Sequence, residues 1–77
     1  MQKGKYRHYK SGNVYQVIGV ALHTETLEEL VVYTSANATT THPANQLWVR
    51  AKSIFLETIN YEGNTVKRFS FIEWDDA

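Results

Sequence analysis

Apolar residues lie most densely between residues 14 and 24, where they occupy both odd and even positions. In an extended strand, successive side chains point to opposite faces. One face would carry Val14, Ile18, Val20 and Leu22, and the other would carry Tyr15, Val17, Ala21 and His23. We therefore expect a long strand that is partly buried on each side, that bends near Gly19 and that places Ile18 in the core.

A shorter alternating segment precedes this strand at residues 5–10. Tyr6 and His8 fall on one side of it, and Arg7 and Tyr9 fall on the other. The turn residues 11–13 follow directly. The pattern predicts a strand and a tight hairpin that leads into the long strand.

The rest of the chain alternates between polar connections and short apolar runs. Residues 29–34 are rich in β-branched and aromatic residues, which predicts a second hairpin after the polar residues 24–28. Residues 35–46 are small and polar, include a proline, and form a longer connection than usual. We further expect a strand at residues 47–50, one helical turn and then a strand within residues 51–58, a turn centred on residues 63–64, and a strand at residues 66–72.

Five or six short strands with at most one helical turn predict an all-β fold. With so few strands, we expect a small, partly open, SH3-like barrel. The 77 residues allow one domain, which we place at residues 4–73, with residues 74–77 as a C-terminal tail.

Composition narrows the function classes. The chain contains no cysteine, which excludes disulfides, thiolate nucleophiles and cysteine-ligated metals. Eight basic and eight acidic residues give a net charge of zero, which argues against nonspecific nucleic-acid binding. The first residues lack the apolar segment of a secretory signal, and the chain lacks an apolar run long enough to span a membrane. We expect a cytoplasmic protein with no membrane association.

Five motifs together resemble a family of short bacterial domains known only as a domain of unknown function. They are GKYRHYK at residues 4–10, GNVYQVIGVA at residues 12–21, HTET at residues 23–26, VVY at residues 31–33 and LWVR at residues 47–50. The resemblance covers about residues 4–72 and implies a small β-rich bacterial cytoplasmic protein, but it implies no activity. The chain departs from the family pattern in its long loop at residues 35–46 and in having Ala51 where the family often has proline.

Aromatic and cationic residues interleave in two of these motifs. Arg7, His8 and Tyr9 come from the first motif, and Trp48 and Arg50 come from the last. Rings beside guanidinium groups can hold an anion or stack on a planar ligand. The same residues could instead be structural, with stems and rings closing the open end of the barrel.

His23 and Glu25 form a second candidate site at the end of the long strand. If the strand continues that far, the two side chains lie on the same side, about 7 Å apart. This spacing suits metal ligands or a general acid and base, and a third ligand would come from His8 or Glu57. A packed histidine beside an exposed turn carboxylate is the simpler explanation of the pair, because metal sites need three or four convergent ligands and only two are visible here. We expect no metal and no cofactor.

The leading interpretation is a noncatalytic binding module. Its ligand would be a protein, a peptide or a small anion, and its open strand edges could also pair with a second copy. A small hydrolase or metal-assisted enzyme centred on His8, His23 and Glu25 is the alternative, and nucleic-acid binding through a barrel face is third. The residues assigned to ligand binding are Arg7, His8, Tyr9, His23, Trp48 and Arg50.

Overall fold

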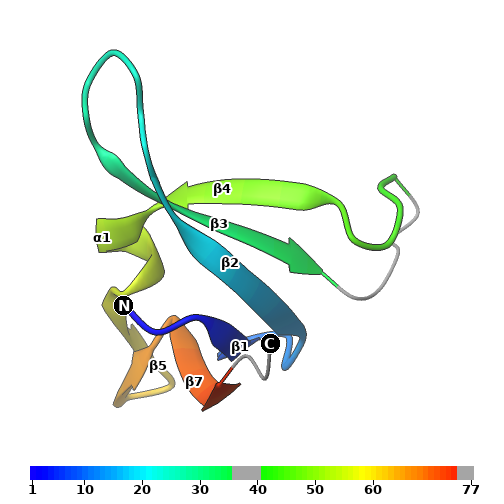
Figure 1. The fold of residues 1–77 in the computed structure, drawn as a ribbon. Coiled ribbons are helices and arrows are strands. Elements are labelled where there is room, and N and C mark those ends of the chain that lie inside the picture. Colours follow the sequence, from blue (N-terminus) through cyan, green and yellow to red (C-terminus); the bar gives the residue numbers. More distant parts are fainter. Residues whose placement is uncertain (36–40, 75–77) are drawn as a thin grey trace.

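The fold was obtained as a computed structural model that describes residues 1–35 and 41–74 (Figure 1). Its elements, in chain order, are β1 (Gly4–His8), β2 (Val14–Leu22), β3 (Glu29–Ser35), β4 (Leu47–Ala51), α1 (Lys52–Phe55), β5 (Thr58–Tyr61), β6 (Asn64–Lys67) and β7 (Phe69–Trp74). The predicted all-β fold with one helical turn is confirmed. The one described helix is far too short to cross a membrane.

The described strands form two antiparallel sheets. The larger sheet has the order β4-β3-β2-β1-β7, and the smaller sheet is the hairpin β5-β6. Both predicted hairpins, β1-β2 and β2-β3, are present. The described strands do not close into a barrel, in agreement with the open form that the sequence predicts, while the SH3-like assignment stays a prediction.

The strand predicted at residues 66–72 is in fact two strands, which raises the described total to seven. The break lies at Arg68, whose backbone N–H donates to the carbonyl of Glu57 and whose carbonyl accepts from the N–H of Tyr9. Before Arg68 the chain pairs with β5, and after it the chain pairs with β1. Arg68 is therefore the corner between the two sheets.

The prediction that Ile18 lies in the core is wrong. Its side chain is 47% exposed, whereas that of Val17 is fully buried. The β2-β3 register shifts at this point, with Val17 opposite Tyr33 and Gly19 opposite Val32, so that Ile18 is an extra residue in a β-bulge. The bulge interrupts the alternation, so a strict period of two placed Ile18 in the core although its side chain is exposed.

The core lies between the larger sheet and α1. Phe55 of α1 is fully buried and stacks on Phe69 of β7, with ring centroids 4.1 Å apart and rings parallel within 1°. Tyr6 and Tyr33 reach the same cluster from β1 and β3. In Figure 1, α1 and β5 lie on this side of the sheet, while the β2-β3 hairpin extends well beyond it.

The turn at residues 61–65 is displaced by one residue from the predicted centre. Tyr61 pairs with Asn64, so the two loop residues are Glu62 and Gly63, and both have positive φ angles, of 51° and 82°. Positive φ at both positions is typical of a type I′ hairpin turn. The turn directs the chain from β5 back along β6 toward the Arg68 corner.

Candidate functional site

Register on the inner face of the larger sheet brings several candidate residues together. Tyr33 pairs with Trp48 and Val31 with Arg50, so Trp48 and Arg50 share the face of β4 that points toward the core. His8 pairs with Phe69 on the same face at the other side of the sheet. The curvature of the sheet then allows β4 and β7 to approach one another through the Phe69 ring.

Phe69 joins Arg50 to His8. The guanidinium carbon of Arg50 lies over the Phe69 ring, 5.5 Å from its centroid, and the His8 ring meets the same ring edge-on at 5.0 Å. Phe55 stacks on Phe69 as well, so the ring of Phe69 contacts Arg50, His8 and Phe55. Phe69 itself is only 4% exposed, whereas Arg50 and His8 are half-buried and reach solvent.

Further aromatic side chains extend the group from His8. The rings of His8 and Tyr9 have centroids 4.9 Å apart, and Tyr9 meets Tyr61 of β5 edge-on at 5.0 Å. Tyr9 reaches this side because β1 ends at His8 and the chain then turns, which places it beside His8 rather than opposite. We use the name cation–aromatic cluster for six half-buried residues: His8, Tyr9, Trp48, Arg50, Tyr61 and Arg68.

The electrostatic field in the cluster is positive at His8. Burial lowers the pKa of His8 below its ordinary value of 6.5, and the positive charges of Arg50, Arg68 and Lys10 lower this pKa further. Arg68 is partly neutralised by Glu57, with Nη2 and Oε2 2.9 Å apart. Among the residues that the structure describes, no carboxylate forms an ion pair with Arg50. Arg50 is therefore the cation of the cluster whose charge is least compensated.

Hydrogen bonding fixes the tautomer of His8. Its Nδ1 accepts the backbone N–H groups of Lys10 and Ser11, at 3.3 and 3.5 Å. An acceptor nitrogen carries no proton, so the neutral ring holds its proton on Nε2. His8 can therefore offer one N–H donor to a ligand while its other nitrogen stabilises the turn.

His23 is not part of the cluster. It stabilises a turn of the same type as the turn at His8. Its Nδ1 accepts the N–H groups of Glu25 and Thr26, at 3.1 and 3.3 Å. The backbone bonds around His8, to Asn13 and from Gly12, recur around His23 as bonds to Glu28 and from Leu27. Both turns share the pattern His-x-x-Ser/Thr, a local signal that the sequence carries at residues 8–11 and 23–26.

The structure does not bring His8, His23 and Glu25 together. His8 precedes β2 and His23 follows it, and a strand of nine residues is about 30 Å long. No group of three or more metal-ligating side chains occurs in the described part of the chain. Glu25 lies in the turn rather than on a continued strand, so the expected spacing of strand ligands is absent.

Arg7 is also separate from the cluster. It is exposed and pairs with Val14 and Ser70 on the outer face of the sheet, opposite to His8. Alternation along residues 5–10 already places Arg7 and His8 on opposite sides. Of the six predicted ligand-binding residues, the structure joins three through ring contacts, His8, Tyr9 and Arg50. Trp48 shares the inner face of β4 with Arg50, and its ring meets that of His42, with centroids 4.8 Å apart.

Tyr61 and Arg68 belong to the cluster but are absent from the sequence-based set. Tyr61 reaches it only because β5-β6 folds over the end of β1, and Arg68 reaches it only because the chain breaks between two strands. Both placements depend on pairing between distant segments. The one local signal, a basic residue inside an apolar strand pattern, does not by itself indicate a corner.

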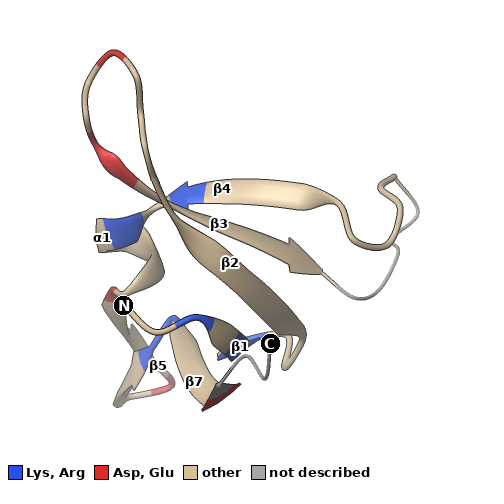
Figure 2. Cartoon of the chain, in the orientation of Figure 1, with Lys and Arg blue, Asp and Glu red and all other residues tan. Residues whose placement is uncertain are grey.

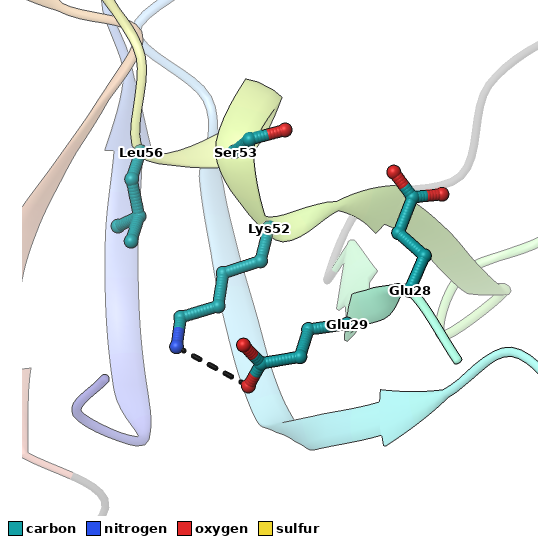
Figure 3. Close-up of a pocket in the computed structure, with 5 residues that line it drawn as sticks. All are labelled: Glu28, Glu29, Lys52, Ser53 and Leu56. Atoms are coloured by element: carbon teal, nitrogen blue, oxygen red, sulfur yellow. Dashed lines mark hydrogen bonds and ion pairs between the residues drawn. The ribbon is translucent and has the colours of Figure 1, made fainter. Parts of the chain in front are cut away.

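Two hollows on other parts of the surface are weaker candidates for a functional site. One of about 320 Å³ is lined by Glu28, Glu29, Lys52, Ser53 and Leu56 (Figure 3). Its lysine is paired with Glu29 at 3.4 Å, and the carboxylates of Glu28 and Glu29 point in different directions. The two acids therefore do not form a carboxylate dyad. Another, of about 400 Å³, lies beside Tyr6, Phe69 and Phe71 and is mostly apolar.

Charge is distributed unevenly over the fold. Figure 2 shows acidic residues at the far end of the β2-β3 hairpin and basic residues on β1, at the end of β4 and on α1. The acidic hairpin end includes Glu25, Glu28 and Glu29. The net charge of zero therefore combines an excess of acidic residues in the β2-β3 hairpin with an excess of basic residues in the rest of the chain.

Comparisons with known proteins agree with this fold. No protein with a curated description matches the chain. A crystal structure of a DUF1653 protein from Bordetella bronchiseptica is similar, with 32% sequence identity and a TM-score of 0.83 over 100% of this chain and 94% of that one. Residues 4–71 match the family described as "Protein of unknown function (DUF1653)". The chain therefore belongs to the DUF1653 family, as the motifs in its sequence predicted.

Proposed function

We propose that this protein is a noncatalytic binding module whose cation–aromatic cluster recognises an anionic group, a carboxylate or a phosphate, on a protein, a peptide or a small molecule. The observation that carries the proposal is Arg50. Its guanidinium is held over Phe69, is half-buried, and has no carboxylate partner among the described residues. An arginine fixed in this way retains hydrogen-bond donors that suit either anion.

Two neighbours support the same ligand chemistry. The Nε2–H of His8 provides a neutral donor in the same cluster as Arg50. The pKa of His8 is lowered first by burial and then by the positive charges of Arg50, Arg68 and Lys10, and an anion would offset these charges. Tyr9, Trp48 and Tyr61 supply rings against which an apolar part of the ligand can pack. The best ligand would therefore combine an anion with an aromatic or apolar group.

The alternative functions draw less support. A hydrolase or metal-assisted enzyme would need His8, His23 and Glu25 in one place, and these residues occupy two separate turns. Nucleic-acid binding generally uses many cations along one surface, whereas the cluster contains two arginines, one of them paired with Glu57. A binding module needs neither arrangement.

Titration with phenyl phosphate, followed by amide NMR, tests the proposal. We expect the largest chemical-shift changes at His8, Arg50 and Phe69, and weaker binding of inorganic phosphate, which lacks a ring. Arg50→Ala should weaken phenyl phosphate binding at least tenfold, a loss typical of one charged contact. Arg7→Ala, which removes the same charge from the outer face, is the matched control and should bind as the parent does.

Two results would contradict the proposal. Equal weakening by Arg7→Ala and Arg50→Ala would mean that only net charge matters. A stability loss of about 2 kcal/mol in Arg50→Ala with no difference in binding would make Arg50 a structural cover for Phe69.

A further inference from the structure

The strand β4 forms an open edge of the larger sheet. One side of it pairs with β3, from Leu30 opposite Ala51 to Thr34 opposite Leu47. No described strand pairs with its other side, so β4 is an edge strand. The carbonyl of Leu47 accepts a hydrogen bond of 3.3 Å from the side chain of Gln46. On its outer face, Leu47 and Val49 are 59% and 60% exposed. This edge is apolar, regular and accessible.

The opposite edge of the sheet is protected, and the contrast is informative. At β7, the register shifts opposite Lys5 and Tyr6, and Lys5 forms an ion pair of 3.0 Å with Glu73. Bulges and charges are the usual devices that prevent one sheet edge from pairing with another. The β4 register has no shift over its five pairs, and its only charged residue is Arg50, which faces the core. An apolar edge without bulges or exposed charges is expected where a further strand pairs with the sheet.

The sequence of β4 is complementary to itself. If a second copy pairs antiparallel about a two-fold axis at the central residue, Val49 faces Val49 of that copy, and all five residues find partners. Leu47 then faces Ala51 on the outer face, which makes an apolar pair. Trp48 faces Arg50 on the inner face, where a guanidinium beside an indole ring is favourable. Neither face places like charges opposite one another.

We infer that β4 is a homodimer interface, at which two copies join their five-stranded sheets into one continuous antiparallel sheet. The inference goes beyond the proposed ligand and does not depend on it. The dimer would also place the two cation–aromatic clusters on the same face of the joined sheet, each with Trp48 of the other copy beside its Arg50. A strand pair of this length buries a small area, so the association should depend on concentration.

Sedimentation equilibrium over a concentration series tests the dimer. The parent chain should pass from monomer to dimer, and Val49→Lys should stay monomeric, because the two-fold axis places its two ammonium groups directly opposite one another. Ile18→Lys is the matched control, since Ile18 is also exposed but lies on the interior strand β2. It should dimerise as the parent does. A parent that stays monomeric throughout, or equal dimerisation by both variants, would overturn the inference.

Cross-linking tests the register without a charge change. The chain has no cysteine, so Val49→Cys introduces its only thiol. A short bis-maleimide should convert this variant to a covalent dimer, whereas Ile18→Cys should remain uncross-linked. Equal yields from the two variants would overturn the register. Phenyl phosphate titration of the Val49→Lys monomer keeps the two proposals separable, because the substitution leaves the cluster within one chain intact.

Discussion

Val17 and Ile18 are neighbours in sequence, and their substitution tests the bulge that separates them. Val17→Ala removes two fully buried methyl groups. Burial of such groups contributes about 0.8 kcal/mol each, and the cavity left behind adds to the loss, so the free energy of unfolding should fall by about 2 to 3 kcal/mol. Ile18→Asp changes a side chain that is 47% exposed, and it should cost about 1 kcal/mol, mainly in strand propensity.

Urea denaturation followed by circular dichroism measures both values. A domain of this size has a total stability of about 5 kcal/mol, so the Val17→Ala loss is a large part of it and Val17→Asp should not fold. The Ile18→Asp variant serves as the control, since it carries the same new charge one residue along. An Ile18→Asp variant that is less stable than Val17→Ala would refute the bulge and restore a strictly alternating β2.

Two further predictions concern the two similar turns that begin at His8 and His23. Leu27 has a φ of 61° and is 68% exposed, at the position where Gly12, with a φ of 73°, serves the other turn. Leu27→Gly should therefore raise the unfolding free energy by about 0.5 to 1 kcal/mol in urea melts, and a loss would show that Leu27 packs against the hairpin. The pKa of His8 is lowered in the folded state, so the unfolded chain binds the proton more tightly. The stability contributed by neutral His8 is complete above about pH 6.5 and is lost as the pH falls through the lower folded pKa. His8→Gln should reduce the slope of stability against pH between about pH 7 and 5, and an unchanged slope would contradict this assignment.

Local patterns in the sequence were sufficient for the elements that depend on near neighbours. Both hairpins, β4 and the helical turn were predicted because their signals, alternation and turn residues, lie within each segment. The Ile18 bulge and the Arg68 corner were missed for one reason. Each is defined by pairing with a distant strand, β3 in the first case and β1 with Glu57 in the second. A bulge or a corner of this kind does not alter the pattern of apolar and polar residues along the chain.

The candidate site, too, could be predicted only where its signals lie close together in the sequence. His8 and Arg50 could be named from the sequence because rings and cations alternate around them, but their common contact with Phe69 required the folded sheet. Arg7 was included with His8 although alternation separates them, and the structure places it on the outer face. His23 looked like a ligand because histidine is versatile, whereas the fold uses its Nδ1 as an acceptor for two backbone N–H groups.

The protonation of His8 gives the most direct test of the proposed anion site. Proton NMR titration of the His8 ring should give a pKa below 6.5 in the parent chain, because burial and then Arg50, Arg68 and Lys10 disfavour the charged form. The pKa should rise in Arg50→Ala, stay unchanged in Arg7→Ala, and rise in the parent when phenyl phosphate is added. A His8 pKa at or above 6.5 that responds neither to the loss of Arg50 nor to phenyl phosphate would contradict the account.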